Sequence, residues 1–280
     1  MGQALVALLA LGLSACTLPV ADPEARPSAP ATESAAAESA APTATASPKL
    51  APPKARLANA VAALRWSEPL GYDFVVSDSG AKLIEALGTW DPGTRSASLK
   101  VLIANPRKPE KRVGGRLVVI DGVRYGSLRN GCWMRLGHRM LEERLGLTDD
   151  TLGLSAVDAL AEVRVTGVAP NSADVLQVEF ELGRVMAMMG APREERVEGR
   201  VPGEVTVLDG QVAEWTIDGA DLAESFASDV PARLAKRIAS LALDMEFFYD
   251  EAEEIRRPPY DKLAPNGRTP CPDATTTTKA

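Results

Sequence analysis

Apolar and polar residues alternate with a period of two along most of the chain beyond about residue 70. Tyr72, Phe74 and Val76, for example, alternate with Asp73 and Ser77. Successive side chains of a strand point to opposite faces, so each such segment predicts a strand with one apolar and one polar face. Segments of the same kind occur at 99–103, 117–125, 163–166, 176–182, 205–217 and 241–249. The pattern predicts an antiparallel sheet that buries one face and exposes the other to water.

Two of these segments are interrupted by an Asp-Gly pair. Asp121-Gly122 separates Leu117–Ile120 from Val123–Tyr125, and Asp209-Gly210 follows Val207 in the same way. Asp-Gly between two apolar-alternating runs is a strong signal for a two-residue type I′ turn. We therefore expect two tight hairpins at these positions.

Helical periodicity is limited to short segments. Lys54 to Trp66 has an apolar face of Leu57, Val61 and Leu64. Shorter candidates lie at 140–147, 155–161, 182–189, 221–227 and 232–240. The predicted class is α+β: a strongly curved antiparallel sheet, or half-barrel, with a few helices on its concave face. If the helices fill the space under the sheet it is core, and if they do not it is a lipid-sized cavity.

The chain begins with a short apolar run, Ala4 to Leu13. This run is too short to cross a bilayer but fits the apolar region of a secretory signal, although Met1-Gly2-Gln3 lacks the usual basic residue. Leu13-Ser14-Ala15-Cys16 closes it and is similar to a bacterial lipobox. We expect residues 1–15 to be a signal peptide and Cys16 to carry the lipid. The alternative is a cleaved signal followed by an incidental cysteine.

The rest of the chain divides by composition. Residues 16–54 are rich in Pro, Ala, Ser and Thr, which predicts a flexible linker. Residues 55–262 form the expected domain, and 263–280 a flexible tail. The net charge is −7, from 31 basic and 38 acidic residues, and there is no basic patch that would indicate nucleic acid.

Three cysteines are present. With Cys16 acylated, the remaining pair, Cys132 and Cys271, suggests one disulfide in an oxidising compartment. The alternative is a buried free Cys132 and a reactive thiol at Cys271. The sequence does not say whether the two residues come within bonding distance.

Motifs for catalysis are missing. His138 is the one histidine, and there is no Gly-x-Ser-x-Gly, His-Glu-x-x-His or phosphate-binding loop. The single, widely spaced cysteines do not make a zinc site. We therefore expect no enzyme, no metal and no cofactor. A hydrolase using two acidic residues from distant segments is a third hypothesis.

The apolar faces are the candidate lipid-binding residues. Met186 lies in a methionine-rich segment, and methionine suits surfaces that bind varied apolar partners. The set that we expect to line an acyl-chain cavity is Leu176, Val178, Phe180, Met186, Val205, Val207, Trp215 and Ile217. Ordinary core packing is the alternative for each of them.

Three stretches, taken in order after the lipobox and linker, resemble a known family. They are 117–125 (LVVIDGVRY), 132–137 (CWMRLG) and 203–212 (GEVTVLDGQV). Over about 57–259 the chain resembles the LppX/LprG/LprA lipoproteins of actinobacteria. The resemblance implies a half-barrel akin to the periplasmic lipoprotein carriers, which holds acylated glycolipids or phospholipids without catalysis. Cys132 and the tail beyond Pro259, with Cys271, depart from the family pattern.

The sequence thus supports two main hypotheses. The first is a lipoprotein anchored through Cys16 to the outer face of the cytoplasmic membrane, which binds acylated lipids or glycolipids and carries or presents them in the cell envelope. An envelope transporter is a candidate partner. The alternative is a non-catalytic envelope interaction module with a filled core that tethers or regulates a protein partner.

Overall fold

The computed structural model describes residues 51–105, 108–127, 132–137, 147–190, 198–226, 235–236 and 238–264. The signal segment, Cys16, the linker up to residue 50 and the tail with Cys271 lie outside these ranges. The strands are β1 (Leu70–Asp78), β2 (Ala81–Asp91), β3 (Ser96–Asn105), β4 (Lys108–Ile120), β5 (Val123–Ser127), β6 (Met134–Leu136), β7 (Arg164–Val168), β8 (Val175–Glu181), β9 (Arg200–Leu208), β10 (Gln211–Asp218) and β11 (Leu241–Phe248). The helices are α2 (Pro53–Arg65), α3 (Ala156–Ala161), α4 (Leu182–Met188), α5 (Gly219–Ser225) and the 3₁₀ turn η2 (Tyr260–Lys262).

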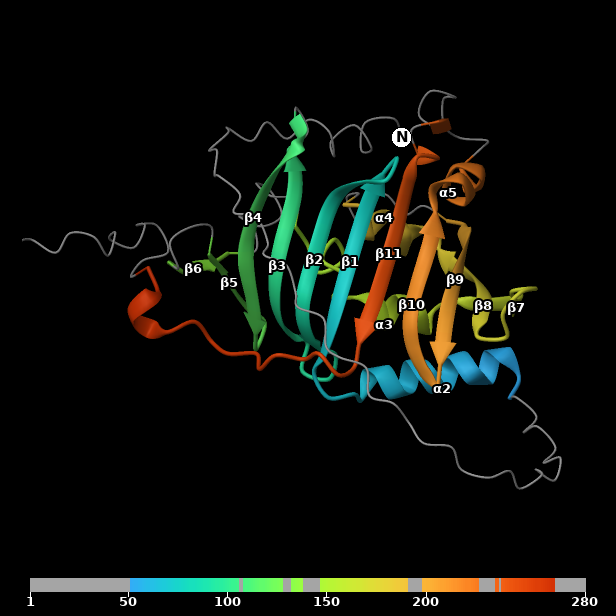
Figure 1. The fold of residues 1–280 in the computed structure, drawn as a ribbon, viewed down its shortest axis with the longest axis horizontal. Helices are drawn as coiled ribbons and strands as arrows, with labels where there is room; N and C mark the ends of the chain where they lie inside the picture. Colours follow the sequence, from blue (N-terminus) through green and yellow to red (C-terminus); the bar gives the residue numbers. More distant parts are fainter. Residues whose placement is uncertain are drawn as a thin grey trace, which may run out of the picture. The chain divides into compact units, whose positions relative to one another are not determined.

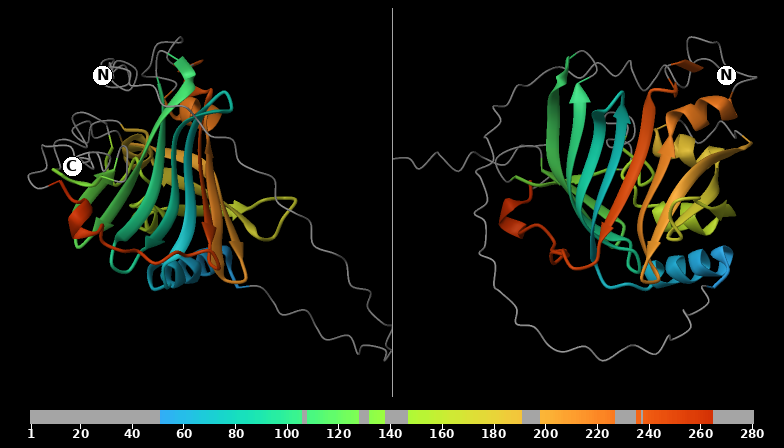
Figure 2. Two further views of the ribbon diagram at one scale, coloured as in Figure 1. Left: turned by 60° about the vertical axis from the view of Figure 1, so that its left-hand side comes forward. Right: turned by 45° about the vertical axis from the view of Figure 1, so that its right-hand side comes forward.

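All eleven strands belong to one sheet, in the order β6-β5-β4-β3-β2-β1-β11-β10-β9-β8-β7. Each pair of neighbours is antiparallel, and the last strand, β11, joins the two halves by pairing with β1. The strands at the two ends, β6 and β7, are not paired with each other, so the sheet stays open (Figures 1 and 2). The predicted α+β half-barrel is therefore confirmed.

The tight hairpins form where the sequence predicts them. Asp121 and Gly122 have φ angles of 52° and 72°, and Asp209 and Gly210 have 49° and 80°. Two successive residues with positive φ define the type I′ turn. A third turn of this kind, Ser79-Gly80, joins β1 to β2, and the sequence analysis missed both this turn and strand β2.

The helices cover one half of the concave face. The predicted helices at 54–66, 155–161, 182–189 and 221–227 are confirmed as α2, α3, α4 and α5, with ends shifted by a few residues. In Figure 1, α3 and α4 lie behind the sheet, so the viewer faces its outer side. The main contacts of these helices are with β7–β11. The predicted helix at 140–147 lies outside the described residues except for Leu147. Within the one predicted at 232–240, residues 235–236 and 238 are helical and 239–240 form a turn.

After β11 the chain crosses back over the outer face, as Figure 1 shows at the lower end of the sheet. The main-chain N–H of Glu253 donates to the hydroxyl of Thr89 on β2, at 2.9 Å. Trp133, just before β6, then forms a parallel bridge with Leu263. Residues 249–264, here called the C-terminal strap, therefore connect the centre of the sheet to its β6 edge.

Candidate functional site

The concave face is built from rows of inward side chains that run across the strands. Register pairs define three of these rows through β1–β4. The first is Met245, Phe74, Ala86, Val101 and Gly115; the second is Phe247, Tyr72, Gly88, Leu99 and Leu117; the third is Leu70, Trp90, Ala97 and Val119, and it continues to Arg124 on β5. Apart from the hydroxyl of Tyr72 and the guanidinium of Arg124, the side chains of these rows are apolar.

The eight residues predicted to bind lipid lie together in the half of the sheet that the helices cover. Leu176, Val205 and Trp215 are register partners on β8, β9 and β10. Seven of the eight lie on these strands, and Met186 lies on α4, which contacts β8 and β9. All eight are at most 5% exposed. In this structure they form packed core, and their contact with lipid stays a prediction.

Aromatic rings make up much of that core. The ring of Trp215 lies 5.3 Å from Phe180 and 6.3 Å from Phe74, measured between centroids. Trp90 stacks on Phe247 at 6.2 Å. The indole N–H groups of both tryptophans are buried without a hydrogen-bond partner. A buried donor left unpaired costs about 1–3 kcal/mol, so packing of the rings must outweigh that penalty.

The other half of the concave face carries small residues. Ala86 and Gly88 on β2, Ala97 on β3, Gly115 on β4 and Gly126 on β5 all face inward by register. Their side chains add little volume above β2–β5, and the described helices make their main contacts elsewhere, yet Ala86 and Ala97 are fully buried and Leu136 covers Gly126. The sequence analysis missed this region because strand β2, which carries two of the five, was not recognised.

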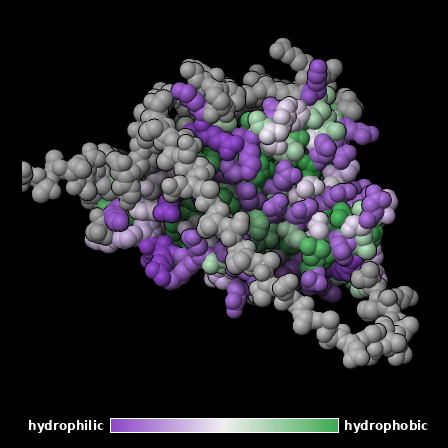
Figure 3. Space-filling model, in the orientation of Figure 1, coloured by the Kyte–Doolittle hydropathy of each residue, from purple (hydrophilic) through white to green (hydrophobic). Residues whose placement is uncertain are grey.

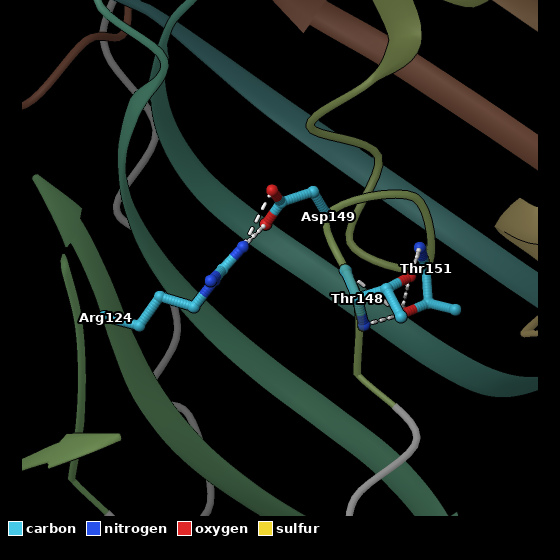
Figure 4. Close-up of polar contacts among 4 residues, drawn as sticks. All are labelled: Arg124, Thr148, Asp149 and Thr151. Carbon is cyan, nitrogen blue, oxygen red and sulfur yellow. Dashed lines mark hydrogen bonds and ion pairs between the residues drawn. The ribbon is translucent and has the colours of Figure 1, made fainter. Parts of the chain in front are cut away.

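A charged pair lies at the end of this region. Arg124 on β5 directs Nη2 toward Asp149, 2.7 Å from Oδ1 and 2.8 Å from Oδ2 (Figure 4). The side chain of Arg124 is 18% exposed and that of Asp149 is 45% exposed. The sequence analysis singled out neither residue for this role. Alternation along 123–125 would have placed Arg124 on the polar face, opposite to Val123 and Tyr125, whereas its register with Val119 places it on the concave face.

The loop that presents Asp149 is held by its own hydrogen bonds. The Thr148 N–H donates to Oγ1 of Thr151 at 2.7 Å, and the Thr151 N–H donates to Oγ1 of Thr148 at 3.1 Å. The buried hydroxyl of Tyr72 donates to the carbonyl of Leu152 at 3.0 Å. Burial, with a smaller contribution from Asp149, raises the pKa of Tyr72 well above its ordinary value, so this hydroxyl stays a donor.

The outer face is polar and acidic, and Figure 3 shows hydrophilic side chains spread over it. A hollow of about 610 Å³ opens there across β7–β10 and is lined by Thr166, Gln177, Val178, Glu179, Pro202, Gly203, Glu204, Thr216, Asp218 and Asp221. Further along the same face, burial raises the pKa of Asp73, against the opposing effect of Lys82 at 3.8 Å. The hollow is not the apolar cavity that the sequence predicts.

Within the ranges that the structure describes, no three His, Cys, Asp or Glu side chains gather to hold a metal ion. None of the described helices has the length and hydrophobicity needed to cross a membrane.

Cys132 is disulfide-bonded. A bonded Cys132 excludes the alternative of a free buried thiol at this position. Its expected partner, Cys271, lies outside the described residues, as does Cys16, so the pairing itself stays a prediction. The strap reaches Trp133, the neighbour of Cys132, through the bridge to Leu263.

These observations define an open antiparallel half-barrel with an apolar concave face. No protein-family model and no curated protein sequence matches the chain. Among solved structures it is similar to LprF from Mycobacterium bovis, with a TM-score of 0.46 and 12% identity over 74% of this chain and 96% of that one. It is also similar to the Mycobacterium tuberculosis lipoprotein LppX, with a TM-score of 0.41 and 11% identity over 73% of this chain and 98% of the other. The predicted resemblance to these mycobacterial lipoproteins is thus confirmed, and at such identities it concerns the fold.

Proposed function

We propose that this protein is a lipid-anchored envelope protein that binds acylated lipids or glycolipids against its concave face. It carries or presents them at the outer face of the cytoplasmic membrane, to which Cys16 attaches it, and it performs no catalysis. An envelope transporter is the partner that such a role would require.

The observation that carries the proposal is the composition of the concave rows. An open sheet with apolar side chains on its inner face has a continuous surface that acyl chains can cover, and each square ångström of apolar surface removed from water contributes roughly 25 cal/mol. Because the sheet does not close, a bound chain would have a way in that does not require strands to separate.

The distribution of small residues favours one half of the sheet for the acyl chains. Over β8–β10 the side chains are large and packed under α2–α5, so a ligand there would have to displace helices. Over β2–β5 the rows contain Ala86, Gly88 and Gly115, and although Leu99 and Val101 there are also buried, none of α2–α5 makes its main contacts with these strands. We therefore place the acyl chains over β2–β5, with the eight residues predicted from the sequence forming the packed wall beside them.

The filled-core interaction module is the second candidate. The burial of the concave face favours it. The eight predicted residues are at most 5% exposed, and so are Ala86, Leu99 and Val101 over β2–β5, so these side chains offer a ligand no free surface in this structure. In that case the acidic outer face, rather than the concave face, would meet the partner.

Native mass spectrometry of the full chain, purified in detergent from an actinobacterial host, distinguishes the two. A copurifying mass that denaturation releases and that organic solvent extracts as an acylated lipid is the expected result. An apoprotein mass that stays unchanged after incubation with host lipid extract would overturn the carrier proposal in favour of the interaction module. The covalent lipid on Cys16 serves as an internal reference because denaturation does not release it.

A further inference from the structure

We propose that Arg124 binds the anionic headgroup of the lipid, a phosphate or carboxylate, and that Asp149 occupies this position until the headgroup replaces it. The inference rests on the proposed function and adds to it the charge of the ligand and the place of its head.

The position of Arg124 supports this role. It follows Leu70, Trp90, Ala97 and Val119 in one inward row, so its guanidinium stands beside apolar side chains. An arginine in such a place is seldom left without an anion, since burying a charge without a partner is costly. The planar guanidinium also fits carboxylate and phosphate with two parallel hydrogen bonds.

Asp149 is a replaceable partner. The loop around it is already held by the reciprocal Thr148–Thr151 hydrogen bonds and by the bond from Tyr72 to Leu152. Leu152 itself is fully buried. The ion pair is therefore not needed to hold the loop in place, and opening it would leave the fold intact.

Solvent reaches the pair from the Asp149 side, where the side chain is 45% exposed. Water screens the carboxylate side of the pair, so an incoming anion competes with an interaction that solvent weakens. A phosphate monoester, with up to two negative charges and three acceptor oxygens, is a stronger acceptor for arginine than the carboxylate of Asp149. The displaced carboxylate of Asp149 would then be hydrated, at little cost in free energy.

The register gives the ligand a direction. Arg124 pairs with Val119, and the next inward pair on the same strands is Leu117 with Gly126. Leu117 continues to Leu99 and Gly88, and the row beyond contains Val101, Ala86 and Gly115. A headgroup at Arg124 therefore directs an acyl chain toward the small-residue rows of β2–β5, which the chain would reach by displacing side chains that bury them, such as Leu136 over Gly126.

The test uses two amphiphiles with the same chain, dodecyl phosphate and dodecyl maltoside, each titrated below its micelle concentration into the purified full chain. The variants are Arg124→Met, which keeps the length of the side chain, and Asp149→Asn, with near-ultraviolet circular dichroism to show that each is folded. Arg124→Met should weaken dodecyl phosphate about tenfold or more, since it removes charge-assisted hydrogen bonds, and leave dodecyl maltoside unchanged. Asp149→Asn should strengthen dodecyl phosphate, because it removes the competitor.

These opposite effects separate headgroup binding from a structural ion pair. If both substitutions weaken both amphiphiles alike, the inference is overturned while the proposed lipid-binding function stands. If neither amphiphile binds the wild-type chain, the proposed function itself fails. Inorganic phosphate at the same concentration should not displace dodecyl phosphate; displacement would mean that Arg124 takes a free anion, which also overturns the inference.

Discussion

Trp133 and Leu263 form a parallel β-bridge between the strap and the edge of the sheet. The Trp133 N–H donates to the Lys262 carbonyl at 2.8 Å, and the Ala264 N–H donates to the Trp133 carbonyl at the same distance. The bridge satisfies both main-chain groups of Trp133 at an edge that would otherwise be open to pairing with another chain. It also brings the chain that leads to Cys271 next to Cys132.

We expect Cys132 to be bonded to Cys271. Ala264 lies beside Trp133, and the short segment from Ala264 to Cys271 has ample length to return to Cys132. Peptide mapping under non-reducing conditions should yield one crosslinked peptide that contains both cysteines. Replacing both by serine should reduce the free energy of unfolding by about 2–4 kcal/mol, because a long loop is no longer closed in the unfolded chain.

The single variant Cys271→Ser is the control for this pairing. It should expose one thiol at Cys132 that reacts with maleimide in the denatured protein. A Cys132 that stays blocked in that variant would show that another cysteine is its partner.

Gly210→Ala should destabilise the protein by about 1 kcal/mol, measured by urea unfolding. Gly210 has a φ of 80° in the turn between β9 and β10, and no atom lies within 4 Å of a Cβ built there. The loss would therefore come from backbone conformation alone. Gly137→Ala is the matched control, since Gly137 also has open space but no positive φ, and it should be neutral.

Local patterns were enough to predict much of the fold. Alternation identified β1, β8 and β11, and the Asp-Gly pairs identified two hairpins, because turn chemistry and strand period are properties of neighbouring residues. Strand β2 was missed because Leu83 and Ile84 are adjacent and Gly88 interrupts the alternation. The shift in β1–β2 register at Val76/Ser77 is the structural counterpart of that break.

The candidate site was less predictable. Alternation tells which side chains of a strand face inward, but not which part of a sheet the helices cover. Val178 and Val101 have the same pattern in the sequence, yet α3 and α4 contact β8, whereas the main helix contacts do not include β3. The partner of Arg124, Asp149, comes from a loop, and no local pattern specifies such a long-range contact.

Asp244→Asn should raise the melting temperature at pH 7. Burial, followed by the nearby carboxylates Glu214 and Glu246, raises the pKa of Asp244 above its ordinary value of 3.8. A carboxyl whose pKa is raised by folding stabilises the protein below the unfolded pKa and loses that contribution as the pH rises through the folded pKa. The gain from Asn should therefore shrink as the pH is lowered toward about 4.

Asp250→Asn serves as the comparison for this effect, because Asp250 is an exposed aspartate just after the same strand. It should change the melting temperature little at either pH. A lower melting temperature for Asp244→Asn at pH 7 would contradict the expected sign.

Val101→Trp should prevent lipid binding in the molecules that fold, and because Val101 is 5% exposed it should also destabilise the protein by about 1–3 kcal/mol. Val101 faces inward between Ala86 and Gly115, its register partners, so the indole would extend over the smallest side chains of the concave face and occupy the proposed acyl-chain surface. The measurement is lipid occupancy by native mass spectrometry, together with near-ultraviolet circular dichroism for the fold.

Val178→Trp is the matched variant on the half of the sheet that the helices cover. There Val178 is 1% exposed between Val165 and Gly203, so overpacking should destabilise the protein by about 1–3 kcal/mol. Full lipid occupancy in folded Val101→Trp would move the acyl chains away from β2–β5 and return β8–β10 to consideration.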